Sequence, residues 1–207
     1  MRHFQLCLSS CATMLLLALN LHASTGLPLP LSAENSAHCA LLFKSLRLNI
    51  TELLKSKDLC YGLIQSNEVT VRSVETVQAC APSGTQNSGC VMLTNSSFNE
   101  SECVMSIMRD LAYYDAAIAS YLESPLYRPD KEVPLLSPTL GIIQDLRKNC
   151  SPKTQRGYNS SEDTDNLWNN DSYINRQKMC KMMRGFHSRA ITINRAIGYI
   201  SSGDHRK

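Results

Sequence analysis

Apolar side chains recur every three or four residues in four separate stretches of this chain, which is the spacing of amphipathic helices. The longest such stretch runs from Tyr173 to Ser202, and its apolar stripe consists of Met179, Met183, Phe186, Ala190, Ile193, Ile197 and Ile200. Similar stripes occupy about 37–56 and about 104–123. We expect the remaining helix to begin at Ser137 as N-cap, with Pro138 in its first position, and to end before residue 151.

The links between these helices are long, short and long, in that order. Residues 57–100 show no sustained helical period, and residues 151–171 are polar and acidic. The short middle link makes the second and third helices antiparallel neighbours, whereas each long link can cross the whole length of a bundle. No alternating stretch is long enough for a sheet, so we predict an all-α fold. The specific prediction is a four-helix bundle with the up-up-down-down topology of cytokines and two long crossover loops.

The first 24 residues have the features of a cleaved signal peptide. Arg2 and His3 are basic, residues 6–21 are apolar, and small residues follow at Ala23 and Ser24, where cleavage is expected. The apolar run is too short and too interrupted to span a membrane. We therefore expect a secreted, extracellular protein that does not insert into a membrane. Its predicted parts are a signal peptide (1–24), an N-terminal extension (25–36), the bundle domain (37–202) and a C-terminal tail (203–207).

Composition and motifs argue against an enzyme and against nucleic-acid binding. The net charge is +3, with acidic and basic residues mixed along the chain and no basic block interleaved with aromatic residues. The sequence contains no His-Glu-x-x-His, Gly-x-Ser-x-Gly, phosphate-binding loop or dinucleotide fingerprint. It also lacks the inward Glu-x-x-His pairs of metal-binding bundles. We expect no catalytic residue, no metal site and no cofactor.

The cysteines and glycosylation sequons fit a secretory route. Two of the nine cysteines lie in the predicted signal peptide, which leaves seven, at positions 39, 60, 80, 90, 103, 150 and 180. An odd number in a secreted chain predicts three internal bridges and one further cysteine, which is a free thiol or half of an interchain bond. Six Asn-x-Ser/Thr sequons are candidate glycosylation sites: Asn49, Asn95, Asn99, Asn149, Asn159 and Asn170.

The back of the last helix differs from an ordinary charged surface. At about 100° per residue, Ser188, Thr192, Arg195 and Tyr199 fall roughly opposite the apolar stripe. Gly198 lies inside the same helix, at a cost of about 1 kcal/mol relative to alanine unless something needs close approach there. Two interpretations stay open. Either this is a solvated helix back, or the helix buries one face and offers the other to a partner.

Part of this last helix resembles a known family. The segment 189–200, Arg-Ala-Ile-Thr-Ile-Asn-Arg-Ala-Ile-Gly-Tyr-Ile, resembles the end of the last helix of interleukin-12 alpha subunits. Residues 75–80, residues 97–103 and the position of Cys180 resemble that family too. The resemblance implies a secreted four-helix cytokine subunit that forms a disulfide-linked heterodimer with an interleukin-12 beta-type chain, itself similar to a receptor ectodomain. It further implies signalling through cell-surface receptors on T and NK cells that induces interferon-gamma.

The resemblance also implies the roles of particular residues. Arg195 would enter an acidic pocket of the beta chain, surrounded by the remaining contacts Ser188, Arg189, Thr192 and Tyr199. A second surface, for the membrane receptor, would contain Tyr173 and Trp168, the only tryptophan. For Trp168 the alternative is a ring folded back onto the end of the bundle.

The family pattern implies three disulfides, Cys39–Cys90, Cys60–Cys180 and Cys80–Cys103. Cys150 would then be the odd or interchain cysteine. An alternative remains, in which Cys90 bonds the partner and Cys39 pairs elsewhere. The competing function is a stand-alone four-helix cytokine or growth factor, which would have no use for a partner-facing Arg195.

Overall fold

The computed structural model describes residues 33–56, 58–60, 63, 75–80, 98–151 and 167–202. Their helices are α2 (Ala33–Lys55), α3 (Glu75–Cys80), α4 (Glu100–Glu123), α5 (Pro129–Asn149) and α6 (Ser172–Ser202). No strand occurs within these ranges, and the four long helices form a bundle, so the all-α prediction is confirmed. The predicted signal peptide and C-terminal tail lie outside the described residues.

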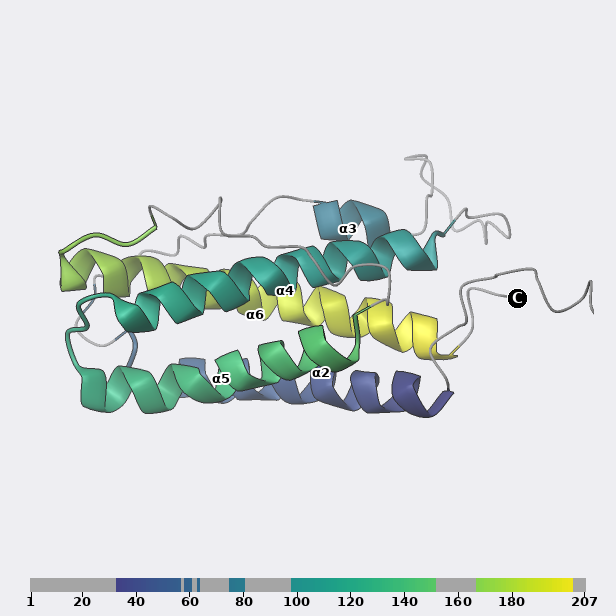
Figure 1. Ribbon diagram of the computed structural model, residues 1–207, viewed down its shortest axis with the longest axis horizontal. Helices are drawn as coiled ribbons and strands as arrows, with labels where there is room; N and C mark the ends of the chain where they lie inside the picture. The colour runs from purple at the N-terminus through teal and green to yellow at the C-terminus, as the bar shows by residue number, and fades with distance from the viewer. Residues whose placement is uncertain are drawn as a thin grey trace, which may run out of the picture. The chain divides into compact units, whose positions relative to one another are not determined.

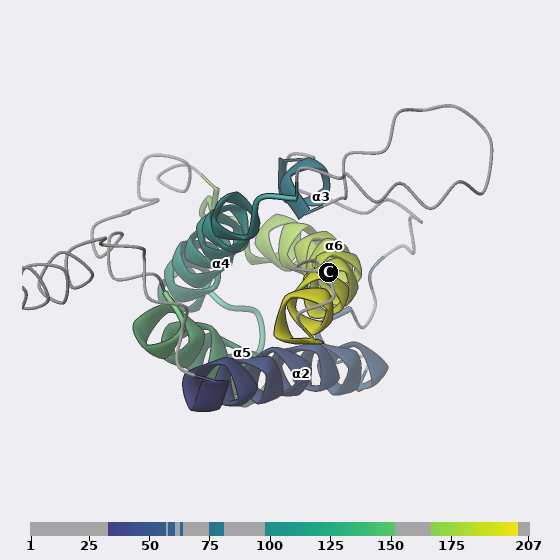
Figure 2. The same ribbon diagram turned by 90° about the vertical axis from the view of Figure 1, so that its right-hand side faces the viewer.

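The direction of the helices is that of a cytokine bundle. In Figure 1, α2 and α4 run one way along the bundle, and α5 and α6 run the other way. Figure 2 looks along the bundle and shows α2 beside both α5 and α6, with α4 completing the ring. The short link between α4 and α5 joins antiparallel neighbours, as expected. The up-up-down-down topology is therefore confirmed.

Side-chain caps explain where two of the helices begin. At the start of α4, Asn99 accepts a hydrogen bond from the backbone N–H of Glu102 at 3.1 Å. Before α6, the carboxylate of Asp171 accepts from the backbone N–H of Tyr173 at 2.9 Å and from that of Ile174 at 3.2 Å. Each cap satisfies N–H groups that have no partner within the first helical turn. The predicted starts of these two helices are correct to within a few residues.

The start of α5 differs from its prediction. We expected Ser137 to be the N-cap, but the helix already begins at Pro129 and contains Pro134 and Pro138 in its interior. The hydroxyl of Ser137 instead donates to the carbonyl of Val133 within the helix, at 2.8 Å. Pro129 takes the first position, where a missing N–H costs nothing. Burial of Leu136 and the other inward side chains of this segment holds the helix together despite the internal prolines.

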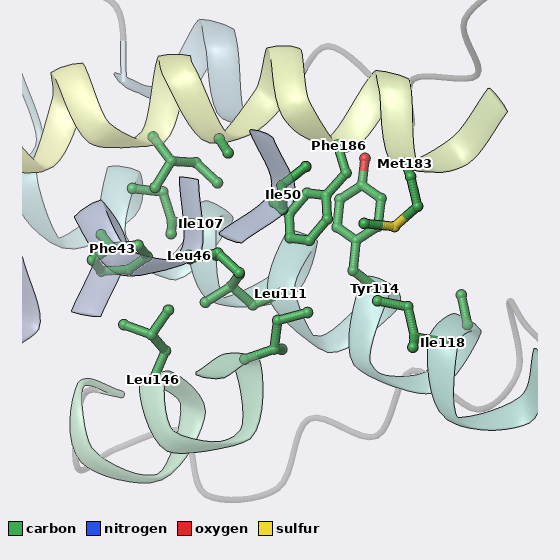
Figure 3. Packing of buried hydrophobic residues seen from close by; sticks show 14 of the residues in the cluster. Phe43, Leu46, Ile50, Ile107, Leu111, Tyr114, Ile118, Leu146, Met183 and Phe186 are labelled. Atoms are coloured by element: carbon green, nitrogen blue, oxygen red, sulfur yellow. The ribbon is translucent and has the colours of Figure 1, made fainter. Parts of the chain in front are cut away.

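The core forms where the apolar stripes of the long helices meet. The predicted stripe of α6 is buried from Met179 to Ile197, and Ile200 is half-buried. Figure 3 shows its centre, where Phe186 of α6 faces Tyr114 of α4. These two rings stack at a centroid distance of 3.7 Å and an interplanar angle of 15°. Side chains of this size contribute most of the burial that stabilises such a bundle.

Three disulfides among the described residues join the elements of the bundle. Cys60 bonds Cys180 in α6, and Cys80 bonds Cys103 in α4, which are two of the implied pairs. The predicted Cys39–Cys90 bridge is wrong, because Cys39 bonds Cys150 with a Cα–Cα distance of 5.8 Å. The reason is topological. Since α2 and α5 are antiparallel neighbours, the beginning of α2 and the end of α5 lie at the same end of the bundle.

The Cys39–Cys150 bridge also corrects the role of Cys150. This cysteine was expected to be the odd or interchain one, but it is buried at the end of α5 and holds α2 to α5. Three bridges use six of the seven cysteines that follow the predicted signal peptide, and Cys90 is the seventh. Cys90 lies outside the described residues.

Candidate partner-binding face

Arg195 lies on the surface of α6, on the face that the helical wheel set apart. Arg195 and Ser188 are exposed, and Thr192 and Tyr199 are half-buried. The ring of Tyr199 packs edge-on against Phe98, just before α4, at a centroid distance of 5.4 Å. We call this set of four α6 residues, Ser188, Thr192, Arg195 and Tyr199, the Arg195 face. The structure therefore brings four of the five predicted contacts together at the surface.

Arg189 is the exception, and its predicted surface role is corrected. Only 2% of this residue is exposed. Its Nε lies 3.2 Å from Oδ2 of Asp110, which is buried on α4. Arg189 is about 120° round the helix from Arg195, far enough to point between α4 and α6. The side chain stabilises the packing of the bundle and does not belong to the Arg195 face.

The short helix α3 covers this buried pair. α3 packs on both α4 and α6, and the hydroxyl of its Thr76 donates to the carboxylate of Asp110 and to the backbone carbonyl of Ser106 at 3.2 Å. Thr76 is 1% exposed. The sequence did not predict α3, because six residues are too few to show a helical period. The bridge from Cys80, the last residue of this helix, to Cys103 holds it on α4.

The two residues of the predicted receptor surface differ in exposure: Tyr173 is exposed, whereas Trp168 is half-buried. Tyr173, at the start of α6, is 42% exposed. Trp168 instead folds back onto α4, where its indole N–H donates to Oγ of Ser120 at 2.9 Å and its ring packs edge-on against Tyr121 at 5.0 Å. For Trp168 the folded-back alternative describes the structure. A satisfied, half-buried indole stabilises the bundle end and is a poor anchor for a receptor.

A second exposed aromatic residue lies near Tyr173. Tyr127, in the link between α4 and α5, is 60% exposed. The guanidinium of Arg176, on the first turns of α6, lies 4.8 Å from the centroid of the Tyr127 ring, which places Tyr127 beside the start of that helix. Tyr127 was not among the predicted site residues, because nothing in the sequence shows that the link between α4 and α5 lies against the beginning of α6.

Neither metal ligation nor membrane insertion is supported by the parts of the chain that the structure describes. Within them, no three histidine, cysteine, aspartate or glutamate side chains are grouped as a metal site would require. Among the described helices, none has both the length and the hydropathy to cross a bilayer.

The up-up-down-down direction of the four long helices and the disulfides of the bundle define the class, which is that of helical cytokines. Within this class, the chain belongs to the interleukin-12 alpha subunit family, whose family model matches residues 7–203. It is a cytokine subunit and not an enzyme.

Individual relatives are distant. The chain is 25% identical to the human interleukin-12 subunit alpha over 156 residues, which cover 67% of this chain and 68% of the relative. It is 26% identical to the Macaca mulatta subunit over the same length and the same shares. With the Marmota monax subunit it shares 25% identity over 172 residues, 74% of this chain and 75% of the relative.

Proposed function

We propose that this chain is secreted and pairs, through the Arg195 face, with a receptor-like interleukin-12 beta-type chain. The heterodimer then engages cell-surface receptors on T and NK cells and drives an immune response that includes interferon-gamma. The competing proposal, a cytokine that acts alone, gives no role to an exposed arginine flanked by small and aromatic residues on the last helix.

The observation that carries the proposal is the state of Arg195 in the isolated subunit. The residue is exposed, and α6 contains no aspartate or glutamate that could neutralise it. The neighbouring Gly198 leaves open space, since a Cβ atom there would meet nothing within 4 Å. A planar guanidinium with free approach suits a bidentate contact with a carboxylate of a partner, and arginine is a frequent interface hot spot.

The test is a binding titration with the beta-type chain. Truncation of a central hot spot costs about 2 kcal/mol or more, which corresponds to about thirtyfold in affinity. Arg195→Ala should weaken capture by at least that factor, with an unchanged melting temperature. Arg195→Lys should restore only part of the affinity, because an ammonium group cannot form the two-point contact. The control is Lys131→Ala, which removes an exposed cation from α5.

Two results would reject this interface. In the first, the wild-type subunit elutes alone from a sizing column after co-expression with the beta chain, as a stand-alone cytokine would. In the second, Arg195→Ala and Lys131→Ala bind the beta chain equally well.

For the covalent link of the heterodimer, the proposal assigns Cys90. The three internal bridges leave this cysteine over, and its neighbours in the sequence, Cys80 and Cys103, are bonded to each other at the start of α4. Cys90→Ser should abolish the heterodimer band on a non-reducing gel while leaving the non-covalent complex intact. A band that persists in this variant would overturn the assignment.

For the receptor surface, the proposal keeps Tyr173 and removes Trp168. Tyr173→Ala should leave stability and capture of the beta chain unchanged while reducing receptor signalling by the assembled heterodimer. Normal signalling by that variant would exclude this end of α6 from the receptor contact.

A further inference from the structure

A groove beside the Arg195 face extends the recognition surface onto a second helix. It lies between α2 and α6 and has a volume of about 420 Å³. The side chains that line it come from both helices: Ala40, Lys44, Arg47, Ile191, Asn194, Arg195, Ile197 and Gly198. Arg195 therefore belongs both to the Arg195 face and to this groove.

The groove and the rest of the Arg195 face lie on opposite sides of Arg195. From Arg195, helix geometry places Ser188, Thr192 and Tyr199 about 20–60° round in one direction, toward Phe98. It places the groove residues Asn194 and Gly198 about 60–100° round in the other direction, toward α2. A partner centred on Arg195 can thus extend toward Phe98 or toward the groove, and it contacts α2 only if it extends toward the groove.

The charge of the groove is positive and is not neutralised from within. Lys44 is exposed and Arg47 is half-buried, both on α2, and Arg195 faces them from α6. None of the described residues that line the groove is acidic. On α2, Oε1 of Glu52 lies 2.8 Å from Nζ of Lys55 and is thus paired within the helix. The helix α6 contains no acidic residue. Like charges gathered in one groove repel each other, so the groove favours an anionic occupant.

The floor of the groove is rigid. The side-chain amide of Asn194 donates to the backbone carbonyl of Phe43 on α2 at 3.0 Å and to that of Ala190 on its own helix at 2.9 Å. The first of these bonds ties α6 to α2 next to two of the groove cations, since Lys44 follows Phe43 and Arg195 follows Asn194 in the sequence. Ile197 is buried beside them. A fixed arrangement loses less entropy on binding than a flexible one.

We infer that the beta chain occupies this groove, contacts α2 as well as α6, and presents at least two carboxylates, one to Arg195 and another to Lys44 and Arg47. This inference rests on the proposed heterodimer and adds α2 to its interface. The beta chain is the occupant that the charges favour, because the groove is continuous with the Arg195 face and none of the described residues that line it is acidic.

The expected effect is mainly on the rate of association. Charged groups at the edge of an interface raise the association rate through long-range electrostatic attraction. Salt weakens this attraction, because the screening length is only about 8 Å at physiological ionic strength. Removal of both α2 cations in Lys44→Gln/Arg47→Gln should lower the association rate constant by about tenfold at low salt. The dissociation rate should change much less, and the salt dependence of association should become shallower.

The test is a kinetic binding measurement with the secreted beta chain at low and at physiological salt. Its matched control is Lys131→Gln/Lys148→Gln, which removes the same charge from exposed positions on α5. Circular dichroism checks that each variant is folded. A second pair of variants carries one substitution each at the exposed Lys44, either Lys44→Gln or Lys44→Glu. At low salt, Lys44→Glu should slow association more than Lys44→Gln does.

The outcomes separate the inference from the proposed function. If the wild-type subunit does not bind the beta chain, the proposed function itself fails. If Arg195→Ala weakens binding but the α2 double variant matches its control within about twofold, the heterodimer stands and the α2 contact is overturned. Retention of the wild-type subunit on heparin that is lost in the double variant, with unchanged beta-chain kinetics, would assign the groove to a polyanion and also overturn it.

Discussion

Arg189 of α6 and Asp110 of α4 form a buried ion pair, with Nε and Oδ2 3.2 Å apart and both side chains almost fully covered. The hydroxyl of Thr76 from α3 donates to the same carboxylate. Arg189 is therefore part of the buried interior of the bundle, whereas Arg195, six residues later in the same helix, lies at the surface of the bundle. This difference leads to opposite expectations for the two arginines.

Arg189→Ala should destabilise the isolated subunit strongly. Removal of one partner of a buried ion pair leaves an unpaired buried charge, at a cost of about 3–5 kcal/mol. The measurement is thermal or urea unfolding of the purified subunit without any beta chain. Ser188→Ala, the exposed neighbour, serves as control and should change little. Equal stability of Arg189→Ala and wild type would show that the ion pair does not support the bundle.

Cys150→Ser should lower stability and secretion, contrary to the odd or interchain role that was predicted for Cys150 from the sequence. The bridge to Cys39 joins residues 111 positions apart. Loss of a native disulfide from a small secreted domain costs about 2–5 kcal/mol. Cys90→Ser is the matched control and should be secreted and melt like wild type. If the two variants are interchangeable in secretion and melting temperature, the Cys39–Cys150 bridge is not structural.

The pair of Tyr121 and Glu132 should make stability sensitive to alkaline pH. The phenol hydroxyl of Tyr121 donates to the buried Glu132 carboxylate, whose other oxygen accepts from the backbone N–H of Arg128 at 2.7 Å. Burial, followed by the hydrogen bond to Glu132, raises the pKa of Tyr121 well above its ordinary value. Its contribution to stability is thus fully present below the unfolded pKa of about 10 and is lost as pH rises further toward the folded pKa.

Tyr121→Phe should therefore have two measurable effects. At neutral pH it should destabilise the subunit by about 1–3 kcal/mol, because a buried carboxylate loses a donor. Above about pH 10, its free energy of unfolding should fall less steeply than that of the parent protein. Urea unfolding from about pH 8 to pH 11 measures both effects, with Cys90→Ser as the background to limit thiol exchange. If the free energies of unfolding of Tyr121→Phe and of the parent protein fall equally with pH, Tyr121 does not titrate in this range.

Glycosylation should distinguish among the sequons. Oδ1 of Asn49 accepts a hydrogen bond from Thr139 of α5 at 2.5 Å, so this half-buried amide lies between two packed helices. We expect Asn49 to carry no glycan in the folded, secreted subunit. The exposed sequons Asn99, Asn149 and Asn170 can each accommodate one.

Asn99 is compatible with a glycan even though it caps α4. Its cap uses the side-chain oxygen and leaves the amide nitrogen, where a sugar attaches, free for that bond. Mass spectrometry of enzymatically deglycosylated peptides identifies the occupied sites. A glycan on Asn49 in protein that is folded and binds the beta chain would contradict the expectation. Asn95 and Asn159 lie outside the described residues.

The sequence by itself determined the class of this protein, because helical periodicity is a local property. The stripe from Met179 to Ile197 is visible in the order of residues and is buried as a helical wheel requires. The lengths of the three links limited the ways in which four helices can be connected. The exposed position of Arg195 also follows from the wheel, since it depends only on its angle from the stripe.

The tertiary structure decided which elements cover each face, and no local pattern contains that information. The wheel shows the direction in which Arg189 points, but α3 and Asp110, which cover and pair with it, come from distant parts of the chain. The partner of Cys39 likewise depends on which helix ends meet, across 111 residues. The position of the Trp168 indole and the groove between α2 and α6 are also decided by contacts between distant segments. Each depends on free energies of contact between segments that only folding brings together.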